Sequence, residues 1–445
     1  GASLLVTLAV LTVATVLVGA VLVLHQAQYR FLRRDAHRLQ ARYAAEAGVY
    51  IVLDSLKRNP SWLPQNHRVP LPDGQESRVT VEPFGGYLFV RSTSRYRRSQ
   101  CTARALAGEI PPDSFRNAIV LWDRASSLHV AGRTRISGDV VVGPRGLRRS
   151  TYRRRRFTGR IEGAVHATEG LQPPYFDGSF LERATDALDA LLGRSSSPRL
   201  ETPYVAARHL PSENPVYAVP GSLRLTSADS TLLSTPVTVV AQGDLTLDGP
   251  LRYAPGTTLV AGRVLRLGDG VDGREGLFYG RDGIVVDGAM QGAGQFFSRA
   301  AIRVARGAYL RYPSLLYVTG EGAEQGAAIT VEGGAAVDGT LVHPAIEPAP
   351  ARKGGRIVVA AGARARGALY NAHETELHGT IYGTVLTHQF YFYESPTHYV
   401  NWLKDATIDV GERPIPYLLP LRFSRRPRLA VLHWEVHLEE PDPAS

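Results

Sequence analysis

An uncharged apolar stretch near the start of the chain constrains the fold more than any other feature. Residues 3–24 read SLLVTLAVLTVATVLVGAVLVL, twenty-two positions without a charged side chain. As a helix with a rise of ~1.5 Å per residue, this stretch would be ~33 Å long, close to the ~30 Å hydrocarbon core of a bilayer. The sequence therefore predicts a transmembrane helix over residues 1–24.

The helical pattern continues beyond the apolar stretch. Apolar residues recur three or four apart from Leu32 to Tyr50, with arginines on the other faces. The first strong stop is Asn59-Pro60, because proline cannot donate a helical hydrogen bond. We predict that residues 25–59 extend the membrane helix as an amphipathic helix, which needs partners to bury its apolar face.

Two sequence phrases in this region resemble a known family. The chain begins GASLL before the apolar stretch, and residues 43–49 read YAAEAGV. Together they look like the N-terminus of PilX-type minor pilins and K-type pseudopilins, over residues 1–58 and more loosely to residue 110. The resemblance implies a leader that prepilin peptidase removes after a glycine, so Gly1 and Ala2 are the candidate processing site. A basic leader would leave the body of the chain on the outer side of the membrane.

The resemblance also implies partners and a location. The helix would pack with other pilin subunits, first in the inner membrane and then in an extracellular type IV-like filament. Most pilins carry a glutamate near the mature N-terminus, whereas no acidic residue precedes Asp35 here. K-type pseudopilins share this lack and sit at filament tips, which suggests a tip position. The alternative is a plain membrane-anchored β-helix protein outside any filament, acting as an adhesin or a carbohydrate-active enzyme.

Composition limits how the exported body can be stabilised. Cys101 is the only cysteine, so an intramolecular disulfide and a cysteine-based metal site are both excluded. With 44 glycines and few long helical patterns, the body is expected to be rich in strands. Strand patterns at residues 77–82, 87–92 and 100–107 predict a small antiparallel meander within residues 60–110.

A repeated phrase sets the architecture that follows. An apolar-x-apolar triplet leads to a glycine four to six residues after its first residue, with triplets starting at 245, 265, 284, 302, 329 and 357. Spacings of 18 to 28 residues match one coil of a parallel β-solenoid, with glycines at the corners. The predicted fold class is thus a membrane-anchored α+β protein: a long N-terminal helix, a small antiparallel meander and a parallel β-helix body with a helical insertion.

The remaining boundaries follow from where the repeat is present. We expect the first solenoid coils over residues 111–171, an insertion with one helix over 172–235, the main solenoid over 236–394, and a C-terminal cap and tail over 395–445. The helix of the insertion is expected near residues 177–192, where apolar side chains recur on one side.

The most distinctive surface feature is a run of arginines. Residues 91–160 contain 17 Arg and 4 acidic residues, a balance of +13. The proposed polyanion-binding residues within this region are Arg148, Arg149, Tyr152, Arg153, Arg154, Arg155, Arg156 and Phe157. DNA is one candidate, with Tyr152 and Phe157 free to stack on bases, and an acidic surface polysaccharide or anionic lipid fits almost as well. The plain alternative is a solvated loop between coils.

Other motifs are better explained by structure than by chemistry. Asp269, Asp272, Asp282 and Asp287 each lie beside a glycine, as ordinary corner turns require, so no catalytic residue is assigned. In the stretch HETELH (residues 373–378), Glu374, Glu376 and His378 would share one face of a strand and could bind Zn²⁺, although a solvent-facing strip is favoured. We expect no metal and no cofactor.

An aromatic cluster follows the last coil. It comprises Phe390, Tyr391, Phe392, Tyr393, Tyr399 and Trp402. Alternating aromatics could form a sugar- or protein-contact face, but a seam between solenoid and cap is the favoured interpretation.

Overall fold

The computed structural model describes residues 2–59, 66–193, 216–226, 235–319, 326–344 and 355–439. Gly1, one half of the predicted processing site, lies outside these residues. The chain divides into two compact units. The first comprises Gly1–Glu82, Leu88–Ala107 and Leu429–Ser445, and the second comprises Pro83–Tyr87 and Gly108–Arg428.

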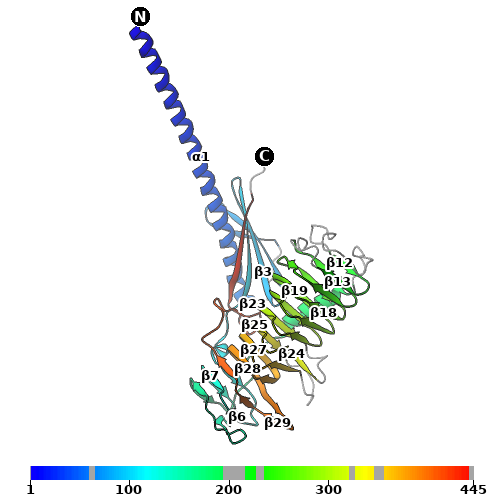
Figure 1. The fold of residues 1–445 in the computed structure, drawn as a ribbon. Coiled ribbons are helices and arrows are strands. Elements are labelled where there is room, and N and C mark those ends of the chain that lie inside the picture. The colour runs from blue at the N-terminus through cyan, green and yellow to red at the C-terminus, as the bar shows by residue number, and fades with distance from the viewer. Residues whose placement is uncertain are drawn as a thin grey trace. The chain divides into compact units, whose positions relative to one another are not determined.

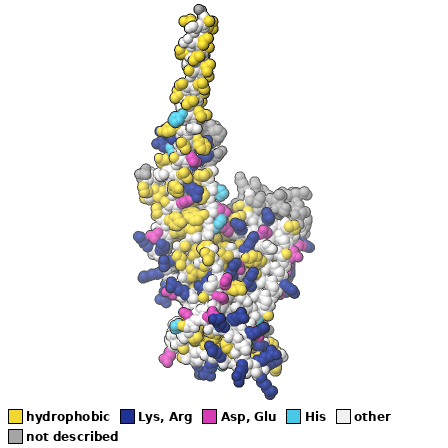
Figure 2. Space-filling model, turned by 60° about the vertical axis from the view of Figure 1, so that its left-hand side comes forward, with side chains coloured by type: hydrophobic (Ala, Val, Ile, Leu, Met, Phe, Trp, Pro, Cys, Tyr) yellow, Lys and Arg dark blue, Asp and Glu magenta, His cyan; other side chains and the backbone are white. Residues whose placement is uncertain are grey.

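The first unit is built on one long helix, α1 (Ala2–Arg58), of 57 residues. Its N-terminal half is apolar and carries no buried residue, so this helix is long and apolar enough to cross a membrane (Figure 1). Figure 2 shows hydrophobic side chains along the projecting part of this helix. The hydroxyls of Thr7, Thr12 and Thr15 each donate to the carbonyl four residues earlier at 2.8 Å. The few polar groups of the stretch are therefore satisfied within the helix itself, as a lipid environment requires.

The second half of α1 packs on a five-stranded antiparallel sheet. The sheet order is β1-β2-β3-β4-β32. Its strands are β1 (His67–Pro70), β2 (Glu76–Phe84), β3 (Tyr87–Tyr96), β4 (Ser99–Glu109) and β32 (Leu429–Glu439), with a short 3-10 turn η1 (Pro72–Gly74) after β1. The predicted long helix and small antiparallel meander are confirmed, and the meander gains an edge strand on each side.

The phrase YAAEAGV is explained by close packing between helix and sheet. The buried helix residues are Ala41, Ala44, Ala45, Gly48, Val49, Val52, Leu53 and Leu56, one face of the helix. A methyl group at Gly48 would lie 2.5 Å from the Ser92 hydroxyl oxygen and 2.6 Å from that of Ser77. These two hydroxyls bond each other at 2.6 Å in the buried contact. Small residues are therefore needed here because the helix backbone lies directly on the sheet.

Gly48→Val tests this contact. The added side chain overpacks the helix-sheet interface, and we expect a loss of about 1–3 kcal/mol or more in the stability of the first unit. Hydrogen exchange of β2 and β3 in the detergent-solubilised full chain measures it. Ala47→Val, one residue away on a less buried side of α1, is the control because it adds the same β-branched side chain. Equal exchange in the two variants would contradict the packing argument.

The second unit is a parallel β-solenoid with three strand ladders, here named A, B and C. Ladder A contains β12 (Val216–Val219), β14 (Thr238–Ala241), β17 (Thr258–Ala261), β5 (Ile119–Leu121), β8 (Val140–Val142) and β11 (Val165–Ala167). Ladder B contains β13 (Leu223–Thr226), β15 (Leu245–Asp248), β18 (Val264–Leu267), β20 (Gly283–Val286), β22 (Ile302–Val304), β24 (Ala327–Val331) and β26 (Arg356–Val359). A separate three-stranded parallel sheet contains β30 (Trp402–Lys404), β6 (Leu128–Ala131) and β9 (Leu147–Arg149). Ladder C contains β16 (Arg252–Tyr253), β31 (Thr407–Asp409), β7 (Arg135–Ser137) and β10 (Arg160–Glu162).

Longer strands pass from one ladder into the next. They are β19 (Asp272–Gly280), β21 (Gln291–Ser298), β23 (Tyr309–Val318), β25 (Ala336–His343), β27 (Arg364–Leu377) and β28 (Thr380–Glu394). A short hairpin strand, β29 (Thr397–Val400), pairs with the end of β28, and a 3-10 turn, η2 (Asp113–Arg116), precedes β5. The predicted parallel β-helix is thus confirmed.

The sequence repeat is the coil of this solenoid. Ile284 pairs with Ile302, and Ile302 with Ile329, so the apolar triplets stack in register. Their side chains form one continuous buried core. The corner glycines that follow have positive φ, 91° at Gly307 and 88° at Gly334, where an L-side chain would be strained. The phrase therefore encodes both the stacked strand and the turn that ends it.

The order of coils in space differs from their order in the chain. In ladder A, β28 pairs with β5 (Val385 with Ile119), and β5 pairs with β8. In ladder C, β28 pairs with β31 and β31 with β7. The coils of residues 119–167 thus stack on the last coil of the main solenoid, joined by strands from the tail (Figure 1).

Two segments differ from the expected organisation. Within residues 172–235, helix α2 (Ser179–Leu191) is present, but β12 and β13 stack in register on β14 and β15, so a solenoid coil lies inside the expected insertion. The tail was expected to cap the solenoid, whereas β31 continues ladder C, β30 pairs in parallel with β6, and β32 joins the antiparallel sheet. Residues 194–215 and 227–234 of the expected insertion lie outside the described residues.

A buried carboxyl group lies where the chain enters the solenoid unit. Glu109 is fully buried, and its Oε2 accepts hydrogen bonds from the backbone N–H groups of Arg422 at 2.7 Å and Phe423 at 3.1 Å. Burial raises the pKa of Glu109 to about 8 from the ordinary 4.5, and the two backbone donors only partly offset this.

Glu109 should therefore make stability fall with rising pH. Above about pH 4.5 the unfolded chain releases this proton, whereas the folded chain keeps it until about pH 8, so the folded state is favoured less as pH rises through this window. Glu109→Gln keeps an acceptor for both N–H groups and should remove this pH dependence. Across the window, Glu109 is expected to lower the free energy of unfolding by roughly a few kcal/mol. Thermal unfolding between these pH values measures it, with exposed Glu412→Gln as the control. A pH dependence that Glu109→Gln leaves intact would contradict the assignment.

Candidate functional site

The arginine run forms the end of β9 and the loop that connects β9 to β10. Arg148 and Arg149 lie on β9, which pairs with β6, and residues 150–159 connect β9 to β10. The loop contains a tight turn, in which the Tyr152 N–H donates to the Arg155 carbonyl at 3.0 Å and the Arg155 N–H to the Tyr152 carbonyl at 2.8 Å. This turn, residues 152–155, is called the arginine turn below.

The two central residues of the arginine turn have left-handed backbone conformations. The φ angles are 43° at Arg153 and 64° at Arg154, as in a type I′ turn. Asn-Gly normally occupies these positions, because a residue with a longer side chain is disfavoured there by roughly 1–2 kcal/mol. Arg153 and Arg154 both adopt this strained backbone conformation, and their guanidinium groups lie at the exposed tip of the turn.

An aromatic cluster holds the base of the turn. Tyr152 is buried, and its ring lies 5.6 Å from Phe392, 5.6 Å from Tyr399 and 6.1 Å from Trp402, all in edge-to-face arrangements. Such pairs add about 0.5–1.5 kcal/mol each beyond the apolar area that they bury. The cluster therefore fixes the arginine turn to the β28–β29 hairpin and to β30.

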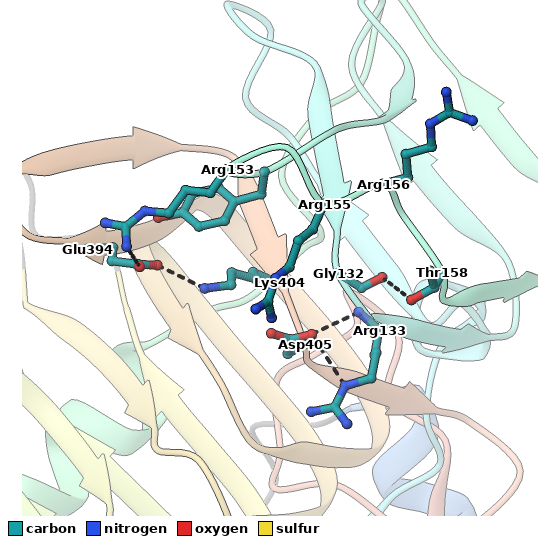
Figure 3. Close-up of a pocket in the computed structure, with 10 residues that line it drawn as sticks. Gly132, Arg133, Arg153, Arg155, Arg156, Thr158, Glu394, Lys404 and Asp405 are labelled. Atoms are coloured by element: carbon teal, nitrogen blue, oxygen red, sulfur yellow. Dashed lines mark hydrogen bonds and ion pairs between the residues drawn. The ribbon is translucent and has the colours of Figure 1, made fainter.

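Charged side chains from the hairpin and β30 surround the turn. The Lys404 ammonium lies 4.4 Å from the centre of the Tyr152 ring, a cation-π contact. Glu394 accepts from both Lys404 Nζ and Arg153 Nη1 at 2.8 Å (Figure 3). The Lys404 hydrogen bond is the main cause that lowers the pKa of Glu394, so this carboxylate stays charged.

A second acidic residue organises the other side of the site. Asp405 Oδ1 accepts from the Arg133 backbone N–H at 2.8 Å and lies 3.8 Å from Arg133 Nε. Gly132 has a φ of 61°, and a side chain there would lie 2.4 Å from Asp405 Oδ1. The Gly132 carbonyl accepts from the Thr158 backbone N–H at 2.8 Å, which ties the end of the loop to the same corner.

These elements enclose an open pocket of about 840 Å³. It is lined by Gly132, Arg133, Tyr152, Arg153, Arg155, Arg156, Thr158, Glu394, Lys404 and Asp405. In Figure 3 the Arg155 side chain points toward Lys404 and Asp405, whereas Arg156 extends away from them. The lining thus carries five cations and two carboxylates. Within the described part of the chain, Arg155 and Arg156 form no ion pair with an acid. The pocket has surplus positive charge to offer an anion.

Not every predicted residue is available to a ligand. Tyr152 was expected to stack on bases, which is wrong because its ring is buried in the aromatic cluster. Phe157 is half-buried against the solenoid core with the Arg149 guanidinium 5.8 Å from its ring centre, so it is not a free stacking surface either. The positive balance of residues 91–160 is also divided, since its first five arginines lie in the other unit. Arg148 and Arg153 to Arg156 are exposed as expected.

Sequence reasoning missed half of the pocket. Arg133, Glu394, Lys404 and Asp405 carry no motif, and about 270 positions separate Arg133 from Lys404. They meet because β30 pairs with β6, with Leu403 opposite Val130. The one available signal was Lys404 itself, one of three lysines in an arginine-rich chain.

The other candidate motifs are occupied by local contacts. Arg356 forms ion pairs with Glu374 at 3.4 Å and Glu376 at 2.9 Å, and His378 bonds Glu376 at 3.0 Å. Among the residues that the structure describes, no group of three potential ligands is arranged for a metal ion. Two of the aspartates serve structural contacts, Asp269 with the Ala289 N–H and Asp287 with Arg266, and Asp272 pairs with Arg311.

Comparisons with known proteins do not identify a family for this chain. No protein-family model matches the sequence, and no curated protein matches it. Among solved structures, the competence-associated pilin ComZ from Thermus thermophilus is similar at 13% identity, over 91% of this chain and 98% of that chain, with a TM-score of 0.19. A TM-score this low carries no argument about fold or function.

The aromatic anchor of the turn can be tested by two substitutions of Tyr152. Tyr152→Ala removes a buried ring and should cost about 3–5 kcal/mol locally. Tyr152→Phe keeps the ring packing and should change stability by less than about 1 kcal/mol. Trypsin cleavage after the arginines of residues 153–156 reports the difference, because only a detached turn is a good substrate. Equal cleavage of the two variants would show that the ring does not hold the turn.

Proposed function

We propose that this protein is a membrane-anchored, pilin-like subunit of a type IV-like filament, which presents its β-solenoid outward. The observation that carries the proposal is the division of α1 into two halves. Among the described residues nothing covers the apolar first half, while the second half lies on a small antiparallel sheet through small side chains. A helix of this kind needs lipid before assembly and neighbouring helices afterwards.

The partners follow from the same helix. Other pilin subunits would cover its apolar surface, and the resemblance of residues 1–58 to minor pilins and K-type pseudopilins supports this arrangement. Residues 1–34 contain no carboxylate that could pair with a neighbour's terminal amine. We therefore place the subunit at or near a filament tip, where such a pairing is not required.

Shearing appendages from native cells tests the filament proposal. The protein should appear in the filament fraction only when prepilin peptidase is active, because processing releases the helix for assembly. Retention in the membrane with an unprocessed leader would contradict the proposal and favour a plain anchor. Labelling along the shaft, instead of at one end, would contradict the tip position alone.

For the solenoid, we propose that the arginine turn and the adjacent Arg156 bind a polyanion. Exposed Arg155 and Arg156 without carboxylate partners in the described residues, beside the Lys404 and Arg133 cations, favour an anion at this pocket. Because Tyr152 and Phe157 are packed inward, recognition would use charge and would not read bases. DNA and an acidic surface polysaccharide therefore both remain candidate ligands.

Replacing both unpaired arginines tests this proposal. Arg155→Gln with Arg156→Gln should weaken binding of a short DNA duplex about tenfold or more at low salt and lower the slope of log K against log salt by about two. Fluorescence anisotropy measures both, and alginate as a competitor separates a nucleic acid from an acidic sugar as ligand. Arg224→Gln with Arg266→Gln is the control, because it removes the same amount of positive charge from ladder B. This control should change the DNA affinity and its salt dependence little. Salt-independent binding would contradict the proposal.

A further inference from the structure

The β28–β29 hairpin has two different faces. Its register pairs Tyr391 with Val400, Phe392 with Tyr399 and Tyr393 with His398. Paired residues in an antiparallel hairpin point to the same side, and successive residues alternate. Phe392, Tyr399 and Glu394 therefore form one face, and this face is already used by the aromatic cluster and the charges around the arginine turn.

The opposite face carries exposed aromatic side chains. It consists of Tyr391, Tyr393, His398 and Val400, named here the outer aromatic face. Tyr393 is 45% exposed, and its ring centre lies 4.8 Å from that of His398. The His398 ring lies 5.5 Å from Tyr391, whose hydroxyl bonds the His398 Nδ1. The three rings thus support one another; Tyr393 and His398 are exposed to solvent, whereas Tyr391 is half-buried.

A row of hydrogen-bonding side chains adjoins these rings. Arg356, Glu374 and Gln389 are neighbours in register across β26, β27 and β28. The Arg356 guanidinium lies 3.5 Å from the centre of the Tyr391 ring, so the row is contiguous with the outer aromatic face. The positive charge of Arg356 is compensated by ion pairs with Glu374 and Glu376. The row therefore offers both donors and acceptors without surplus positive charge.

We propose that the outer aromatic face binds a neutral glycan. The apolar side of a pyranose ring packs on an aromatic ring, and its hydroxyls need planar groups that both donate and accept hydrogen bonds. Tyr393 and His398 supply the rings, and Glu374 and Gln389 supply the polar groups. A polyanion is disfavoured because the two carboxylates outnumber Arg356. A protein partner is disfavoured because Val400 is the only aliphatic side chain on this face of the hairpin.

The inference is independent of the filament proposal and of the arginine turn, because it uses the other face of the hairpin. Its test is a printed array of neutral oligosaccharides probed with the full chain in a detergent without a sugar head group. At least one oligosaccharide should bind, and titration calorimetry with it should show no change in affinity as salt rises from about 0.1 to 0.5 M. Tyr393→Ala should reduce the affinity about tenfold.

Two controls decide the outcome. Tyr382→Ala removes the same side chain from the other end of β28 and should leave the affinity unchanged. Arg155→Gln with Arg156→Gln should also leave it unchanged, which separates this site from the polyanion site. Binding of no neutral oligosaccharide, binding of acidic glycans alone with loss at higher salt, or equal losses for Tyr393→Ala and Tyr382→Ala would each overturn the proposal.

Discussion

In-register stacking of parallel coils is the constraint on which the solenoid unit depends. A triplet such as Ile302-Arg303-Val304 has only two inward side chains, too few to form a core by itself. Its core forms because Ile284 lies on one side of Ile302 and Ile329 on the other. The outward arginine of the triplet is aligned by the same register and pairs with Glu332 of the next coil. Burial inside and charge pairing outside thus follow from one alignment.

The candidate site is a product of the same alignment. Lys404 and Arg133 are remote in sequence, yet β30 and β6 are neighbouring strands, so their side chains line one pocket. The arginine turn adds the remaining cations from a loop whose central residues are conformationally strained. Tyr152 secures that loop to a hairpin whose reverse side exposes Tyr393 and His398. One short hairpin therefore supports a charged surface on one side and an uncharged aromatic surface on the other.

The sequence predicted those features that depend on local patterns. The apolar residues 3–24 and the periodic apolar positions up to Arg58 predict α1, and the triplet-glycine repeat predicts parallel coils. Both patterns can be read from the sequence because the residues that form each of them are close together in the chain. The arginine run was equally visible, but the burial of Tyr152 was not, since its partners Phe392 and Trp402 are over 200 positions away. For the same reason no pattern revealed that Gly132 must be small beside Asp405. Long-range register, which a single sequence does not display, decides these features.

The exchange of coil order has a consequence for how the chain is made. Residues 119–121 are synthesised early, yet their partner in ladder A is the segment around Val385, 266 positions later (385 minus 119). Until that later segment has been synthesised, these early segments have no template on that side, and contacts of such separation are slow to form. The coils that carry the arginine turn can therefore close only after almost the whole chain has been synthesised. A truncated product would keep its long apolar helix but could not complete the surface of the solenoid.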